Sequence, residues 1–92
     1  MKSKQLKQLE AQWRLAKSAY LNARSSLHQF EAMNPGRNRQ AESDRKERQE
    51  TLAAAESHLR AVEEVLNSYN ANPNDSYVQF RTTALLEGRR PF

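Results

Sequence analysis

Two long segments of this chain carry apolar residues at alternating steps of three and four, and the two series fit each other. The first series is Leu6, Leu9, Trp13, Ala16, Tyr20, Ala23, Leu27 and Phe30. The second is Ala41, Arg45, Arg48, Leu52, Ala55, Leu59, Val62, Leu66 and Tyr69. A heptad spacing of this kind predicts two helices that pack on each other along a single seam.

The two series come into register if the chain reverses direction near Gly36. Eight pairs then have residue numbers that add up to 71 or 72, among them Trp13 with Leu59 and Tyr20 with Leu52. Because two antiparallel helices rise equally per residue, a constant sum is what an antiparallel hairpin requires. Near the turn this register places arginines in the seam, where their aliphatic stems would cover it.

We therefore expect one all-α domain over residues 1–92, a long antiparallel coiled-coil helical hairpin followed by a short third helix and a tail. The few Gly and Pro residues agree with long helices, and so short a chain has room for only a small core. The expected parts are a first helix over about 4–33, a turn over 34–38, a second helix over about 39–69, a linker over 70–75, and a short amphipathic helix with a tail over 76–92. Ser3 is the expected N-cap of the first helix.

The third helix is predicted from its caps and its apolar residues. Asn74 or Asp75 can cap its start, and Gly88 stands where a helix of this length would end. Its apolar arc holds Tyr77, Val78, Phe80, Ala84 and Leu85, with Arg81 near the middle. An acidic group is expected to face Arg81, and we expect that group to come from another chain.

One flank of the hairpin lacks charges over most of its length and is lined by small or apolar residues. Its members include Leu15 and Ala19 on the first helix and Ala54, Ala61 and Val65 on the second. Small residues at helical spacing allow another helix to pack closely, so something is expected to cover this flank. Three covers stay open: the chain's own tail, a second copy, or another protein. The own tail is the simplest interpretation for Tyr77, Val78 and Phe80.

This flank and the tail are the predicted contact surface for a partner. The predicted partner-binding residues are Leu15, Ala19, Ala54, Ala61, Val65, Tyr77, Val78, Phe80, Arg81, Leu85, Arg89, Arg90 and Phe92. The partner would be a larger protein, or a second copy in a dimer or symmetric assembly.

The positive charge of the chain lies mainly in its first third. Residues 1–30 hold six Lys or Arg and one acid, whereas residues 31–67 hold six against eight acids. The basic stripe of the first helix, formed by Lys7, Arg14, Lys17 and Arg24, makes a nucleic-acid-binding dimeric helical bundle the alternative function. Trp13 and Tyr20 lie in the seam, where they could not stack on bases, and Lys17 is expected to face Glu56.

No pattern of residues points to catalysis, a cofactor or a metal. Cysteine is absent, and in the predicted register His28 and His58 lie about 21 Å apart along the hairpin. The start of the chain has no apolar signal core, and no run approaches the about 18 apolar residues of a membrane span. We expect a cytoplasmic, non-enzymatic adaptor, assembly factor, co-chaperone or inhibitor that does not enter a membrane.

Overall fold

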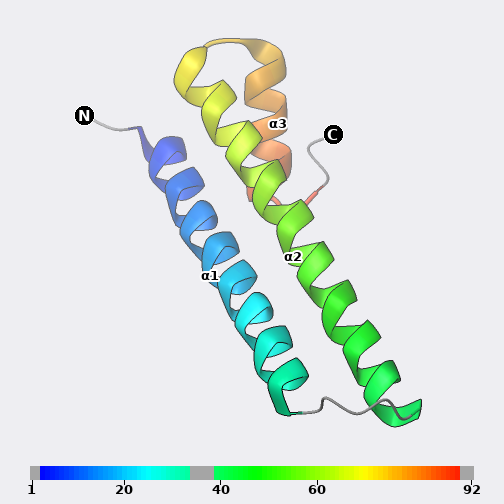
Figure 1. Cartoon of the computed structure of the whole chain (residues 1–92). Helices are drawn as coiled ribbons and strands as arrows, with labels where there is room; N and C mark the ends of the chain where they lie inside the picture. The colour runs from blue at the N-terminus through cyan, green and yellow to red at the C-terminus, as the bar shows by residue number, and fades with distance from the viewer. Residues whose placement is uncertain (1–2, 34–38, 90–92) are drawn as a thin grey trace.

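The computed structural model describes residues 3–33 and 39–89 and contains three helices in this part of the chain (Figure 1). Helix α1 spans Lys4–Met33, α2 spans Arg39–Ala71 and α3 spans Ser76–Leu86. The predicted all-α class is confirmed, and α2 extends two residues beyond its expected end. The predicted turn over 34–38 lies outside the described residues.

Helix α1 begins at the predicted cap. The backbone N–H of Leu6 donates to the Ser3 Oγ at 3.1 Å, and the N–H of Lys7 donates to the Ser3 carbonyl at 3.2 Å. These bonds satisfy donors that the first turn of a helix otherwise leaves without partners. Ser3 also reaches across to α2, because its hydroxyl shares a hydrogen bond with the Tyr69 hydroxyl at 2.6 Å.

Helices α1 and α2 lie side by side and run in opposite directions (Figure 1). The Ser3–Tyr69 bond joins residues whose numbers add up to 72, as the predicted register requires at this end. Leu9 and Val62, a predicted pair, are both fully buried and belong to one core cluster, as partly buried Trp13 and Leu59 also do. The pairing of Tyr20 with Leu52 stays a prediction.

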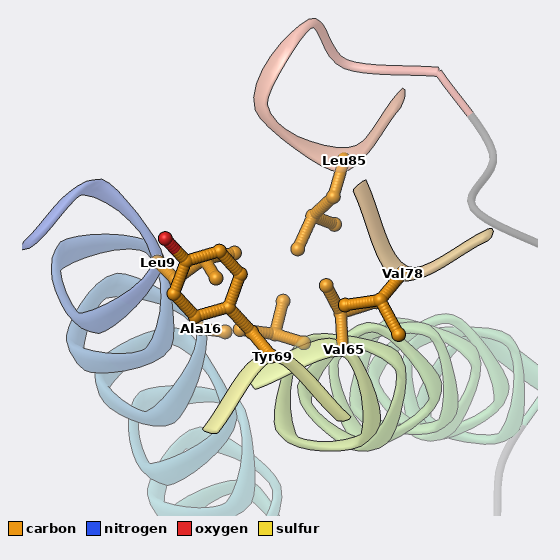
Figure 2. Close-up of a cluster of buried hydrophobic side chains, with 7 residues drawn as sticks. Leu9, Ala16, Val65, Tyr69, Val78 and Leu85 are labelled. Atoms are coloured by element: carbon orange, nitrogen blue, oxygen red, sulfur yellow. The ribbon is translucent and has the colours of Figure 1, made fainter. Parts of the chain in front are cut away.

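The core lies at the end of the hairpin where the chain begins and α2 ends. Leu9 and Ala16 of α1 meet Val65 and Tyr69 of α2 there, and α3 adds further side chains from above (Figure 2). Among the buried side chains of residues 3–33 and 39–89, only Ala41 lies near the turn. The molecule is therefore a three-helix bundle at one end and a two-helix hairpin at the other.

The turn end is held by polar and cation–π contacts in place of a buried core. The Arg48 guanidinium donates to the Ser26 hydroxyl and lies over the Phe30 ring, 4.8 Å from its centroid. Arg45 and Arg48 are both partly buried. These positions agree with the prediction that arginine stems cover the seam, and they add a hydrogen bond and a ring contact that sequence reasoning did not foresee.

Helix α3 is bounded by the predicted kinds of cap. The Asp75 carboxylate accepts hydrogen bonds from the N–H groups of Tyr77 at 2.8 Å and Val78 at 3.2 Å, so Asp75, and not Asn74, is the N-cap. At the other end Gly88 has a φ of 79°, which allows its N–H and that of Arg89 to bond back to the last turn of α3.

Candidate interaction surface

The apolar flank predicted on the hairpin is covered over part of its length by α3 of the same chain. Helix α3 packs on α2, contacts α1, and lies beside the chain-end half of the hairpin (Figure 1). Val65 of α2 is fully buried, and Figure 2 shows it beside Val78 and Leu85 of α3. Of the three covers left open by the sequence, the structure places the chain's own third helix on this half.

Four predicted partner-binding residues are consequently buried inside the chain. Their exposed fractions are 0% for Val65, 8% for Val78, 7% for Arg81 and 7% for Leu85. A partner cannot reach these side chains while α3 is docked. The prediction that they contact a partner does not agree with this arrangement, because the docking of α3 already satisfies them.

The acidic counterpart of Arg81 lies within the same chain. The Arg81 guanidinium is 3.1 Å from the Glu64 carboxylate of α2, and its central carbon lies 5.5 Å from the centroid of the Tyr77 ring. The expectation that this acid comes from another chain is therefore wrong. Glu64 was overlooked because it lies on the outer side of α2, and the long Arg81 side chain reaches it from the buried face of α3.

Tyr77 and Phe80 are exposed, in contrast to the four buried residues above. Their exposed fractions are 61% and 58%, so the interpretation that both rings pack on their own hairpin is wrong. The buried face of α3 is instead formed by Val78, Arg81, Thr82 and Leu85, together with Ala84. The spacing of Val78 and Leu85, seven residues apart, was the signal that could have identified this face.

The remaining predicted residues of the flank lie at or beyond the region that α3 covers. Ala19 and Ala54 are exposed, Leu15 is 66% exposed and Ala61 is partly buried. Closer to the turn the same flank contains a hollow lined by Ala23, Ser26, Asp44, Glu47, Arg48 and Thr51. We call this uncovered stretch, from Ala19 and Ala54 to the hollow, the open groove.

The tail residues are only partly described. Arg89 is exposed and forms an ion pair with Glu87, with nitrogen and oxygen 2.7 Å apart. Arg90 and Phe92 lie outside the described residues. The prediction that the tail contacts a partner therefore rests, within the described part, on Tyr77, Phe80 and Arg89.

The basic stripe keeps its four side chains exposed, but two of them make contacts on their own helix. Arg14 lies 4.0 Å from Glu10, and the Lys17 ammonium lies 4.8 Å from the centroid of the Trp13 ring. Glu56, the expected partner of Lys17, pairs with Arg60 of α2 instead. Binding of nucleic acid by Lys7, Arg14, Lys17 and Arg24 stays a prediction.

The two histidines are both exposed, His28 on α1 and His58 on α2. Residues 3–33 and 39–89 contain no group of three or more His, Asp or Glu side chains arranged to hold a metal ion. In the same part of the chain, no helix is both long enough and apolar enough to cross a membrane. Comparisons with protein-family models, curated proteins and solved structures found no match to this chain.

Proposed function

We propose that this protein is a small, non-enzymatic interaction module of the adaptor, assembly-factor, co-chaperone or inhibitor type. It binds a larger protein through the outer face of α3, with Tyr77 and Phe80 as the anchoring side chains. The observation that carries the proposal is the orientation of α3, which leaves both aromatic rings more than half exposed while Arg81 and Thr82 are buried.

This orientation differs from the one that favours stability of the isolated chain. Full burial of a Phe side chain stabilises a fold by about 1.5–3 kcal/mol, whereas an imperfectly bonded polar group costs free energy when it is buried. Helix α3 does the reverse: it exposes the rings of Tyr77 and Phe80 and buries Thr82, whose hydroxyl has no hydrogen-bond partner within the described part of the chain. Tyr77 and Phe80 would gain this burial energy if a partner covered them. Aromatic residues are also enriched at the centres of protein interfaces.

The open groove supports a helical or extended partner segment on the hairpin itself. Helix α3 shows how a helix packs on this flank, and it covers only the chain-end half (Figure 1). The flank continues toward the turn through Ala19, Ala54 and the hollow beside Arg48. Small side chains there leave room for a second helix to approach closely. Leu15, 66% exposed, adds apolar area near this groove.

The proposal is tested by capture from extracts of the source cell followed by mass spectrometry. The bait is the full chain, and the variant is Tyr77→Ser with Phe80→Ser. Since both rings are exposed, we expect the variant to keep its helix content and melting temperature but to lose one defined protein partner. The matched control, Arg14→Gln with Arg24→Gln, changes two exposed residues of the basic stripe and should retain that partner. Identical captures by bait and variant would contradict the proposal.

A further inference from the structure

Four buried residues of α3 follow the spacing by which a helix binds in a groove. Val78, Arg81, Thr82 and Leu85 stand at positions i, i+3, i+4 and i+7, and none of them is more than 8% exposed. Helices that bind in the grooves of other proteins use the same spacing for their anchoring side chains. The contact between α3 and the hairpin therefore has the form of a ligand in a binding site, although both belong to one chain.

The site on the hairpin consists of an apolar floor and an acidic edge. The floor is Val65 of α2, which is fully buried, lies beside Val78 and Leu85 and belongs to the core cluster of the hairpin (Figure 2). The edge is Glu64, whose side chain is 63% exposed and lies 3.1 Å from the Arg81 guanidinium. We call Glu64, Val65 and the core surface next to them the α3 seat. The seat accepts a helix that presents aliphatic side chains and a cation beside them.

Helix α3 fills this seat imperfectly. Thr82 is fully buried, and its hydroxyl has no hydrogen-bond partner within residues 3–33 and 39–89. The helix has only 11 residues, and isolated helices of this length are unstable in water. An aliphatic residue at the position of Thr82 would avoid the cost of burying a polar group. A longer helix with such a residue would therefore make better contacts with the seat than α3 makes.

We propose that α3 is an autoinhibitory occupant of the seat, and that an amphipathic helix of a larger protein replaces it. The incoming helix carries aliphatic residues at the positions of Val78, Thr82 and Leu85, and Lys or Arg at the position of Arg81. Residues 72–75 hold α3 next to the seat, at an effective concentration on the order of millimolar. A second copy of this chain does not overcome that advantage, because its α3 brings the same buried threonine without the linker.

This inference goes beyond the proposed function, because it concerns the buried face of α3. Tyr77 and Phe80 lie on the outer face, where a partner can bind them while α3 stays docked. Displacement instead requires the open state of the chain, in which α3 has left the seat. The apparent dissociation constant of an added helix is its intrinsic value divided by the open fraction. Any change that loosens α3 should therefore tighten the binding of an added helix.

A synthetic peptide tests the exchange. It comprises residues 74–89 with Thr82→Val and carries a fluorophore, so that anisotropy measures its binding to the full chain. We expect binding to the native chain, and at least tenfold tighter binding to a Leu85→Asp chain, in which a buried carboxylate releases α3. Circular dichroism checks the hairpin, and Asp75→Ala, which loosens α3 through its cap, replaces Leu85→Asp if the hairpin is lost. A peptide of the native sequence should bind about fivefold more weakly, because it keeps the threonine hydroxyl.

A charge exchange tests whether the seat is the binding site. Adding Arg81→Glu to the peptide places a carboxylate beside Glu64 and should weaken binding to the native chain about tenfold. A chain with Glu64→Lys should recover the binding of this peptide, since the charges on both sides are then reversed. Glu63→Lys is the matched control, because Glu63 is the exposed neighbour of Glu64 and lines a different hollow, beside Trp13. This control should not recover binding.

NMR shows whether α3 leaves the seat. In an isotope-labelled chain saturated with unlabelled Thr82→Val peptide, amide signals of residues 77–86 should move to values of an unstructured chain, while those of residues 59–69 stay helical. Each of five results would overturn the proposal: no binding, equal affinity for the native and Leu85→Asp chains, α3 signals that stay helical in the complex, no recovery in the charge exchange, or a native-sequence peptide that binds as tightly and so makes a second copy the occupant.

A last variant separates this inference from the proposed function. Tyr77→Ser with Phe80→Ser in the full chain should leave the affinity for the Thr82→Val peptide unchanged within about twofold, because neither ring lies in the seat. The same variant is expected to lose its partner in the capture experiment. A large loss of peptide binding in this variant would show that the peptide binds the outer face of α3, and would also overturn the proposal.

Discussion

Two polar residues of α3, Arg81 and Thr82, occupy positions where apolar side chains would normally lie. Arg81 is 7% exposed and lies beside Glu64, which is itself largely in solvent. Thr82 is fully buried, and its hydroxyl has no hydrogen-bond partner within the described part of the chain. A buried hydroxyl without a partner costs free energy because it has given up its bonds to water.

Replacement of Thr82 by Val removes this hydroxyl and keeps the branched shape of the side chain. We expect the free energy of unfolding to stay equal or rise by about 1 kcal/mol, because helix propensities of Thr and Val are similar and the desolvation cost disappears. Urea denaturation monitored by circular dichroism measures the change. Thr83→Val, at the partly buried neighbouring position, is the control and should change stability by less than about 0.5 kcal/mol. A clear loss of stability in Thr82→Val would mean that the hydroxyl is hydrogen-bonded in solution.

Helix α3, with 11 residues, is shorter than isolated helices that are stable in water, which need about 12–15 residues. Its stability depends on its docking to the hairpin and on its caps. The N-terminal cap rests on one side chain, the carboxylate of Asp75, which accepts two backbone hydrogen bonds. A change at the cap should therefore affect α3 more than the long helices.

Asp75→Ala should lower stability by about 1 kcal/mol, since it leaves two N–H groups of the first turn without their acceptor. The loss should be local, so trypsin should cut faster after Arg81, which the docked helix keeps buried. Quantified cleavage by mass spectrometry and a urea titration measure both effects. Asn74→Ala is the matched control, because Asn74 is exposed and is not the cap residue; equal effects of the two changes would show that the cap is unimportant.

The whole molecule is elongated, 54 × 24 × 18 Å, and its core is confined to one end. Three helices surround Leu9, Val62 and Val65 at the chain-end half, whereas the turn half has two helices and one buried residue, Ala41, among those described. Local stability follows the density of buried apolar contacts. The two halves of the same long helices should therefore open with different free energies.

Hydrogen–deuterium exchange should resolve this difference. We expect amides of residues 9–16 and 59–69 to exchange more slowly than amides of residues 24–33 and 39–48, because opening the chain-end half disrupts the three-helix core. Peptide-level exchange followed by mass spectrometry measures the ratio in one sample. Uniform protection along both helices would contradict the asymmetric core.

The ends of the third helix could be predicted from the sequence, but the face by which it docks could not. Its start after the linker and its end before Gly88 were predictable, because caps act through neighbours in the chain. Its docked face was not. The predicted apolar arc held Tyr77 and Phe80 together with Val78 and Leu85. The structure buries Val78 and Leu85, leaves the two rings exposed and brings Arg81 to Glu64.

The sequence by itself determined the two long helices and the N-cap at Ser3, and it predicted an antiparallel register that the Ser3–Tyr69 bond agrees with at the chain-end half. Repeating apolar spacing over about thirty residues leaves one seam that buries both series, so many weak local preferences agree on one answer. Only the tertiary structure decided which face of α3 is buried, which half of the flank it covers and which acid meets Arg81. These choices depend on contacts between residues far apart in the chain, and in a helix of 11 residues a few such contacts outweigh the apolar pattern.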